Sequence, residues 1–193
     1  MNHRILVIDD DPKILETCQM ILAPEISKAG EELESMAGEL FEEDVENGSD
    51  ETLNLKFEVT IANEGKIGVD EVGKAIQAGQ SFTMAFVDIR MPYGIDGLET
   101  ARQILSIDPD MEIIILTGYS DTPRQSMAQQ LGVSNFQLLK KPFDPDELMQ
   151  MAQFLAHRHD MHKRRGEQIK WDKKFEQCYG VISYARLGDW WWS

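Results

Sequence analysis

The chain has 193 residues, a formal charge of −15 at pH 7 and a hydrophobic content of 42%. This length suits one packed domain with an appendage and is short for two full domains. The acidic charge argues against a general nucleic-acid binder, whose partner needs a basic face, and favours sites for cations.

The amino-terminal stretch MNHRILVIDDD holds only a short apolar run before three acids, so it predicts no signal peptide. No stretch of the sequence approaches the roughly eighteen consecutive apolar residues of a membrane span. Two cysteines, Cys18 and Cys178, lack metal-ligand spacing and predict no disulfide framework. We therefore expect a cytoplasmic protein that has neither a membrane nor a nucleic acid as a partner.

The first predicted strand, residues 4–8, runs into Asp9 and Asp10. Asp11 and Pro12 then predict the N-cap and the first turn of a helix. The apolar positions of that helix recur at helical spacing, at Ile14, Cys18, Ile21 and Leu22.

Residues 23 to about 52 interrupt the pattern and hold eleven acids against one basic residue, Lys28, which predicts an insertion. Its apolar residues are spaced for a helical stripe, at Ile26, Leu33, Met36, Leu40 and Phe41. Gly30 and Gly38 weaken that stripe. A docked amphipathic helix and a solvated segment both remain open.

Strict alternation of apolar and polar residues over 53–61 predicts a strand. Its apolar positions are Leu53, Leu55, Phe57, Val59 and Ile61. The following stretch, 69–79, places Val69, Val72 and Ile76 on one face of a helix.

The order strand then helix repeats three times more. The predicted strands are 82–88, 112–117 and 136–140, and the predicted helices are 97–106, 122–131 (closed by Gly132) and 145–156 (capped by Asp144, with Glu147 in the capping-box position). Such alternation predicts a doubly wound α/β fold with a mainly parallel sheet and right-handed crossovers. Ligands bind such sheets beyond the carboxyl ends of the strands.

Polar residues follow four of these strands: Asp9 and Asp10 after the first, Asp88 after the third, Thr117 after the fourth and Lys141 after the fifth. Crowded carboxylates repel one another unless they share a proton or bind a divalent cation, and Mg2+ is the natural candidate. An ammonium and a hydroxyl beside them can stabilise phosphoryl oxygens, which favours phosphoryl transfer onto Asp88.

Each of these residues also has a structural interpretation by itself. Thr117 can simply end a strand, Lys141 can be a solvated loop lysine, and Asp9–Asp11 can be an acid cluster at a helix N-terminus. Their joint appearance at successive strand ends favours the functional interpretation.

Four motifs, ILVIDDD, FVDIRMP, ILTGYSD and LLKKPFD, resemble the receiver domain of two-component response regulators, from residue 3 to about 156. The resemblance implies a flavodoxin-like (βα)5 fold with strand order 2-1-3-4-5. It also implies a signalling module that is not an enzyme beyond its own phosphoryl transfer and dephosphorylation. Of two alternatives, a haloacid dehalogenase-like phosphohydrolase is disfavoured because its nucleophile follows the first strand. The other is a receiver-like interaction module that is never phosphorylated.

The resemblance implies that Asp88 is the phosphoacceptor. Asp9 and Asp10 become the acid pair that holds Mg2+ together with Asp88, with Asp10 as the direct ligand of the pair. The backbone carbonyl of Arg90 completes the protein ligands of the cation. The donor is a histidine kinase or a phosphotransfer protein.

Thr117 becomes the switch hydroxyl and Lys141 the phosphate-binding lysine, followed by a cis bond to Pro142. The surface that switches is the helix 122–131, the strand 136–140 and the helix 145–156, which is expected to engage a partner or a second copy of the chain.

Three features depart from the common family pattern. Leu138 stands where the family usually has an aromatic residue, and MPYGIDG, residues 91–97, is one residue longer than the usual loop. The acidic insertion is also uncommon. The insertion, the longer loop and the motif LLKKPFD together resemble a subset of receivers at the amino end of multidomain sensory proteins.

We expect residues 1–156 to form the receiver and 157–193 a basic helical linker or tail, too short for a complete output domain. The tail holds eight Lys and Arg against five acids, so its charge is +3 while that of the remainder is −18. Its His157, His159 and His162 lack the companions of a metal site, so an exposed helix is preferred. Trp190–Trp192 fit an interaction anchor, the edge of a further domain or an added sequence.

Overall fold

The computed structural model describes residues 3–24, 55–118, 123–133 and 136–179, with side chains as far as residue 164. The chain divides into two compact units, Met1–His157 and Arg158–Ser193. The predicted insertion lies almost entirely outside the described residues, as do Trp190–Trp192. None of the helices within the described ranges is long and apolar enough to cross a lipid bilayer.

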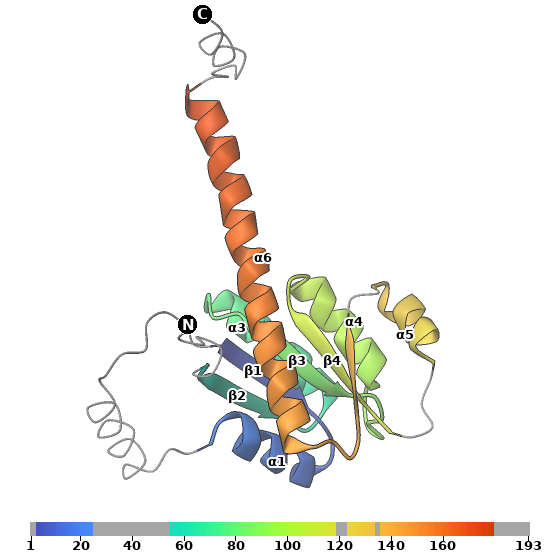
Figure 1. The fold of residues 1–193 in the computed structure, drawn as a ribbon. Helices are drawn as coiled ribbons and strands as arrows, with labels where there is room; N and C mark the ends of the chain where they lie inside the picture. The colour runs from blue at the N-terminus through green and yellow to red at the C-terminus, as the bar shows by residue number, and fades with distance from the viewer. Residues whose placement is uncertain (1–2, 25–54, 119–122, 134–135, 180–193) are drawn as a thin grey trace, which may run out of the picture. The chain divides into compact units, whose positions relative to one another are not determined.

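The first unit is built on a five-stranded parallel sheet with the order β2-β1-β3-β4-β5 (Figure 1). Its strands are β1 (His3–Ile8), β2 (Phe57–Ala62), β3 (Met84–Asp88), β4 (Glu112–Thr117) and β5 (Gln137–Lys140). Every residue of β3 and β4 is buried, as expected for central strands covered on both faces. The predicted strand order is confirmed.

The helices alternate with the strands as predicted. They are α1 (Pro12–Leu22), α3 (Gly65–Gln77), α4 (Gly97–Ile107), α5 (Arg124–Leu131) and α6 (Pro145–Tyr179). Three of the capping residues expected from the sequence lie at the ends of these helices. Asp11 accepts a hydrogen bond from the backbone N–H of Lys13 at 2.9 Å, and Asp144 accepts one from that of Asp146 at 2.9 Å. Gly132 ends α5 in the left-handed conformation, with φ of 71°.

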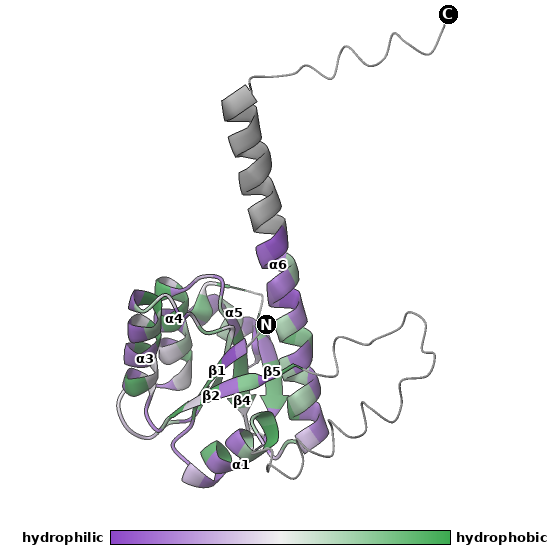
Figure 2. Cartoon of the chain, turned by 90° about the vertical axis from the view of Figure 1, so that its left-hand side faces the viewer, coloured by the Kyte–Doolittle hydropathy of each residue, from purple (hydrophilic) through white to green (hydrophobic). Residues whose placement is uncertain are grey.

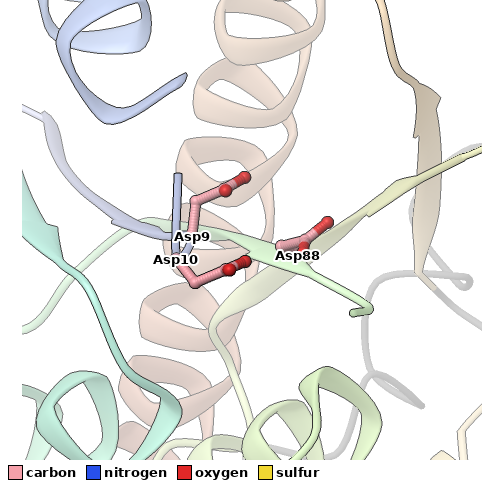
Figure 3. Close-up of side chains that lie close together, drawn as sticks. All are labelled: Asp9, Asp10 and Asp88. Carbon is pink, nitrogen blue, oxygen red and sulfur yellow. The ribbon is translucent and has the colours of Figure 1, made fainter. Parts of the chain in front are cut away.

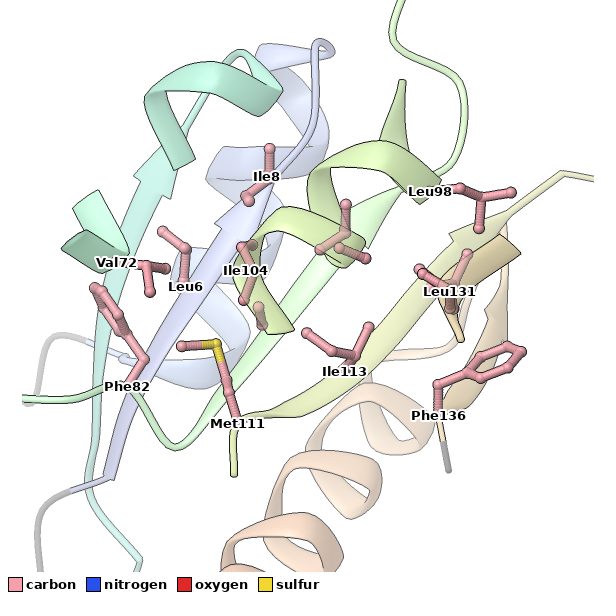
Figure 4. Packing of buried hydrophobic residues seen from close by; sticks show 14 of the residues in the cluster. Leu6, Ile8, Val72, Phe82, Leu98, Ile104, Met111, Ile113, Leu131 and Phe136 are labelled. Atoms are coloured by element: carbon pink, nitrogen blue, oxygen red, sulfur yellow. The ribbon is translucent and has the colours of Figure 1, made fainter. Parts of the chain in front are cut away.

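Two apolar clusters cover the two faces of the sheet. On one face α3, α4 and α5 pack against side chains such as Leu6, Ile8 and Ile113 (Figure 4). On the other face α1 and the first part of α6 pack against side chains such as Val7 and Phe86. Figure 2 shows that the central strand β4 is mostly hydrophobic, whereas the flanking helices carry both hydrophobic and hydrophilic residues. This layering holds the carboxyl ends of the strands at one edge.

Two apolar residues of the predicted strand 53–61 and the predicted helix 69–79 are exposed. Ile61 is 43% exposed because β2 is the outermost strand of the described sheet, where a side chain has a neighbouring strand on one side only. Ile76 is 39% exposed because α3 turns Val72 and Ala75 towards the sheet. Gly68 permits a close approach on this side of α3: a Cβ there would lie 2.2 Å from Cδ1 of Ile8, so the helix backbone packs against that side chain.

Candidate functional site

Three aspartates meet at the carboxyl edge of the sheet. Asp9 and Asp10 directly follow β1, and Asp88 is the last residue of the neighbouring strand β3 (Figure 3). One carboxylate oxygen from each lies within 4.8 Å of the others. Asp9 and Asp88 are buried and Asp10 is exposed, so the cluster has one open side.

The ammonium of Lys141 bridges the two buried carboxylates. Its Nζ lies 2.5 Å from Oδ2 of Asp9 and 2.7 Å from Oδ1 of Asp88. Lys141 follows β5, and its bond to Pro142 is cis, as the resemblance implies. A single cation therefore compensates two charges that burial would otherwise leave unfavourable.

Backbone N–H groups occupy the second oxygen of each buried carboxylate. The N–H of Asp11 donates to Oδ1 of Asp9 at 3.0 Å, and the N–H of Arg90 donates to Oδ2 of Asp88 at 3.2 Å. Each buried acid is thus held by one lysine contact and one backbone contact, which fixes its orientation.

Burial and charge shift the acidity of the bridged pair. Burial raises the pKa of the Asp88 carboxyl above its ordinary value; the ammonium of Lys141 opposes this rise and Asp9 adds to it. Burial lowers the pKa of Lys141, but its hydrogen bonds to Asp88 and Asp9 outweigh that effect and leave the pKa raised. Lys141 is therefore a cation at neutral pH.

A buried thiol lies close enough to the site to feel its charges. Cys18 of α1 is fully buried, and burial, reinforced by Asp9, raises the pKa of its thiol to about 12. The thiol is consequently protonated at neutral pH and unreactive. No pattern in the sequence indicated that this cysteine is near the acid pair.

The predicted switch hydroxyl lies at the end of the next strand. Thr117 ends β4 and is 6% exposed, and its hydroxyl donates to the carbonyl oxygen of Gly118 at 3.2 Å. Its own carbonyl accepts from the N–H of Lys141 at 2.8 Å, so the backbone joins these two residues. Leu138, in the usual aromatic position, is partly buried against the cluster of α3, α4 and α5.

Gly97, the first residue of α4, is a positioning residue that the sequence analysis missed. A Cβ there would lie 1.9 Å from the carbonyl oxygen of Asp88, which is far closer than any real contact. Its N–H donates to the carbonyl oxygen of Ile89 at 3.3 Å. The helix therefore begins against the backbone of the central aspartate, and the glycine after the N-cap Asp96 was the available signal.

The donor set fits a hard divalent cation. Three carboxylates with an open side match the preference of Mg2+ for a few carboxylates and retained waters. Beside them, the ammonium of Lys141 can neutralise an oxygen of a bound phosphoryl group. The arrangement of these residues thus suits both cation binding and attack by a carboxylate on phosphorus.

Residues 42–153, more than half of the chain, match the family described as the response regulator receiver domain. The C4-dicarboxylate transport transcriptional regulatory protein DctD of Rhizobium meliloti (strain 1021) is 48% identical over 65 residues, which cover 34% of this chain and 14% of that protein. The transcriptional regulatory protein FixJ of Bradyrhizobium diazoefficiens is 33% identical over 97 residues, 50% of this chain and 43% of that protein. The chain thus spans less than half the length of either relative.

Solved structures show the same fold at low sequence identity. A CheY-like response regulator receiver domain protein from Methanospirillum hungatei JF-1 has a TM-score of 0.57 and 22% identity, covering 84% of this chain and 99% of that one. A structure described as adenylate cyclase from Rhodopirellula baltica has a TM-score of 0.60 and 23% identity, covering 88% and 98%. With its cluster of Asp9, Asp10 and Asp88, the chain belongs to the response regulator receiver family of two-component systems, whose members are signalling phosphoacceptor modules and not classical enzymes.

Proposed function

We propose that Asp88 accepts a phosphoryl group from a phosphohistidine of a histidine kinase or phosphotransfer protein. An Asp88 carboxylate oxygen attacks phosphorus, the phosphorus–nitrogen bond of the donor breaks, and the imidazole nitrogen keeps the electron pair. The observation that carries this proposal is the bridge of Lys141 to Asp9 and Asp88, at 2.5 Å and 2.7 Å, beside the exposed Asp10.

Mg2+ is the cation that these residues would hold. Its ligands would be Asp10, Asp9, Asp88 and the backbone carbonyl of Arg90, all of them hard oxygen donors. When bound, the cation supplies charge stabilisation for the oxygens of the transferred phosphoryl group. The backbone N–H of Arg90 donates a hydrogen bond to Oδ2 of Asp88 at 3.2 Å, which holds the carboxylate in place.

The remaining two residues stabilise the product. Lys141 carries the charge that a phosphoryl oxygen needs, and its pKa is raised by the two aspartates, so it stays protonated. The hydroxyl of Thr117, now donating to Gly118, turns to donate to a phosphoryl oxygen once Asp88 is modified. Rotation of the Thr117 hydroxyl would link phosphorylation of Asp88 to a change in the connection that follows β4.

The test is the intact mass of the chain after incubation with acetyl phosphate, with and without Mg2+, beside the variant Asp88→Asn. We expect an added phosphoryl mass only when Mg2+ and Asp88 are both present. An adduct that persists in Asp88→Asn would disprove the assignment of the acceptor. The lack of any adduct, together with no binding of beryllofluoride, would favour an interaction module that is never phosphorylated, an alternative suggested by Leu138.

We further infer how the signal leaves the domain. The expected output surface is α5, β5 and the first part of α6, which would engage a partner or a second copy of this chain. The tail, residues 157–193, would act as a linker, a proposal supported by the division of the chain after His157. We also propose that the protein is cytoplasmic. We propose further that it belongs to the subset of receivers found at the amino end of multidomain sensory proteins.

A further inference from the structure

The connection between β3 and α4 is fixed at both ends. Met91 is 8% exposed and belongs to the cluster of α3, α4 and α5. Ile95 lies against the first turn of α3, because a Cβ on Gly65 would come within 3.0 Å of its Cγ1. Asp96 caps α4 by accepting from the N–H of Glu99 at 2.8 Å. Residues 92–94 are therefore presented by a pinned loop.

An aromatic ring stands at the tip of this loop. Pro92, Tyr93 and Gly94 are all exposed, and Gly94 has a φ of 77°, which favours glycine. Tyr93 is 75% exposed, the largest exposed fraction among the large hydrophobic side chains of the described residues. Tyr93 belongs to neither apolar cluster of the described residues, so its ring is free to contact another molecule.

The loop borders the route by which a donor reaches Asp88. Asp88 is 5% exposed and Asp9 is 0% exposed, so a phosphohistidine must approach over the carboxyl edge of the sheet. The connection to α4 starts at Asp88 itself, and on its far side it touches α3, where Ile67 is 40% exposed. A protein that delivers a phosphoryl group must therefore cover this rim, whereas a small phosphodonor need not.

We propose that Tyr93 is a specificity-determining contact for the protein that carries the phosphohistidine, an inference that rests on the proposed phosphorylation of Asp88. Tyrosine is enriched among the residues that dominate interface energies, because its ring buries a large area and orders only two torsion angles. The contact acts on docking. The transfer itself still breaks the phosphorus–nitrogen bond and forms the oxygen–phosphorus bond at Asp88.

The experiment compares two phosphodonors. The protein donor is the histidine kinase of the source genome that transfers fastest to the wild-type chain, purified and phosphorylated on its histidine. The small donor is acetyl phosphate. For Tyr93→Ala we expect kcat/KM for transfer from the kinase to fall about tenfold or more, with the acetyl phosphate rate within about twofold of wild type.

Two variants control the comparison. Tyr93→Phe keeps the ring and is expected to keep most of the transfer rate. Met20→Ala truncates a side chain that is 61% exposed in the last turn of α1, at the opposite end of that helix from Asp9, and is expected to change neither rate.

Each remaining outcome overturns the proposal in a recognisable way. If Tyr93→Ala lowers the transfer rate equally with both donors, Tyr93 affects the phosphorylation site and not docking. If Tyr93→Ala leaves the rate of transfer from the kinase unchanged, Tyr93 does not contact the kinase. Transfer from acetyl phosphate but from no kinase would also overturn the contact. Failure of the wild-type chain with both donors would instead be a failure of the proposed phosphorylation.

Discussion

The two buried aspartates divide their hydrogen bonds in the same way, with one oxygen on Lys141 and the other on a backbone N–H. The backbone N–H groups come from residues close in the chain, whereas Lys141 follows β5 and joins the ends of β1 and β3. Among the described residues, Lys141 therefore supplies the ion pairs of both buried carboxylates.

Replacing Lys141 by Met should lower the free energy of unfolding by about 2 kcal/mol, because it leaves two buried carboxylates without their cation. Urea unfolding measures the effect. The matched control is Lys140→Met, since Lys140 is exposed and surface substitutions rarely exceed about 0.5 kcal/mol. Saturating Mg2+ should narrow the difference between Lys141→Met and the wild type. An equal loss in both variants would contradict the role of the bridge.

Cys18 should resist alkylation in the native protein. Burial, with Asp9, raises its pKa to about 12, so at pH 8 the reactive thiolate is scarce as well as inaccessible. Iodoacetamide labelling followed by peptide mass spectrometry should show modification of Cys18 only after denaturation. Rapid labelling of the native chain at pH 8 would show that this part of α1 opens.

At the scale of the elements, replacing two helix glycines by alanine is expected to have opposite effects on stability. Gly97→Ala should destabilise the protein by about 2–4 kcal/mol and slow phosphorylation of Asp88, because the new Cβ would lie 1.9 Å from the Asp88 carbonyl oxygen. Gly73→Ala, inside α3 with nothing within 4 Å, should stabilise it by about 0.5–1 kcal/mol. Thermal unfolding and acetyl phosphate labelling of both variants test the pair. Equal changes in stability and in labelling rate for the two variants would exclude close packing of α4 on the backbone of Asp88.

The elements could be predicted where local signals decide them. The buried strands β3 and β4 are apolar along their whole length, and caps such as Asp11 and Gly132 mark helix ends. The exposure of Ile61 and Ile76 could not be predicted, because periodicity alone does not show which strand is outermost or which side of a helix faces the sheet.

The sequence was enough to predict which residues of the candidate site lie at the ends of the strands. Parallel topology brings the residues after neighbouring strands together, so Asp9, Asp10, Asp88 and Lys141 could be grouped in advance. The contact of Gly97 with the backbone of Asp88 could not, because it depends on the angle at which α4 leaves the loop. The family match begins at residue 42, after the two amino-terminal acids, so their place in the site comes from the fold.

For the whole molecule, the division into two units predicts where the chain can be shortened. Residues 1–157 should unfold cooperatively with a midpoint within about 3 °C of the full chain, because both apolar clusters lie within them. Truncation after Asp144 is the contrasting variant, since it removes Leu148, Ala152 and Leu155 from one cluster. Calorimetry compares the three chains. Loss of folding in both fragments would show that the first unit depends on the second.

Mg2+ should stabilise the folded chain by linkage. At a free concentration one hundred times Kd, a cation that binds only the native state adds about 2.7 kcal/mol, which corresponds to a rise in Tm of roughly 5–10 °C. EDTA should abolish the rise, and Asp10→Ala should shift the concentration dependence to higher Mg2+. An unchanged dependence in Asp10→Ala would contradict its assignment as a ligand.

The bond from Lys141 to Asp9 joins residues 132 positions apart in the chain. During synthesis Asp9 leaves the ribosome long before Lys141, which pairs with it, and β5 is the last strand of the described sheet to be made. A nascent or truncated chain therefore carries Asp88 and Asp9 without the ammonium that pairs with them. If Asp88 is the acceptor, as proposed, we expect phosphorylation only in chains whose sheet is complete.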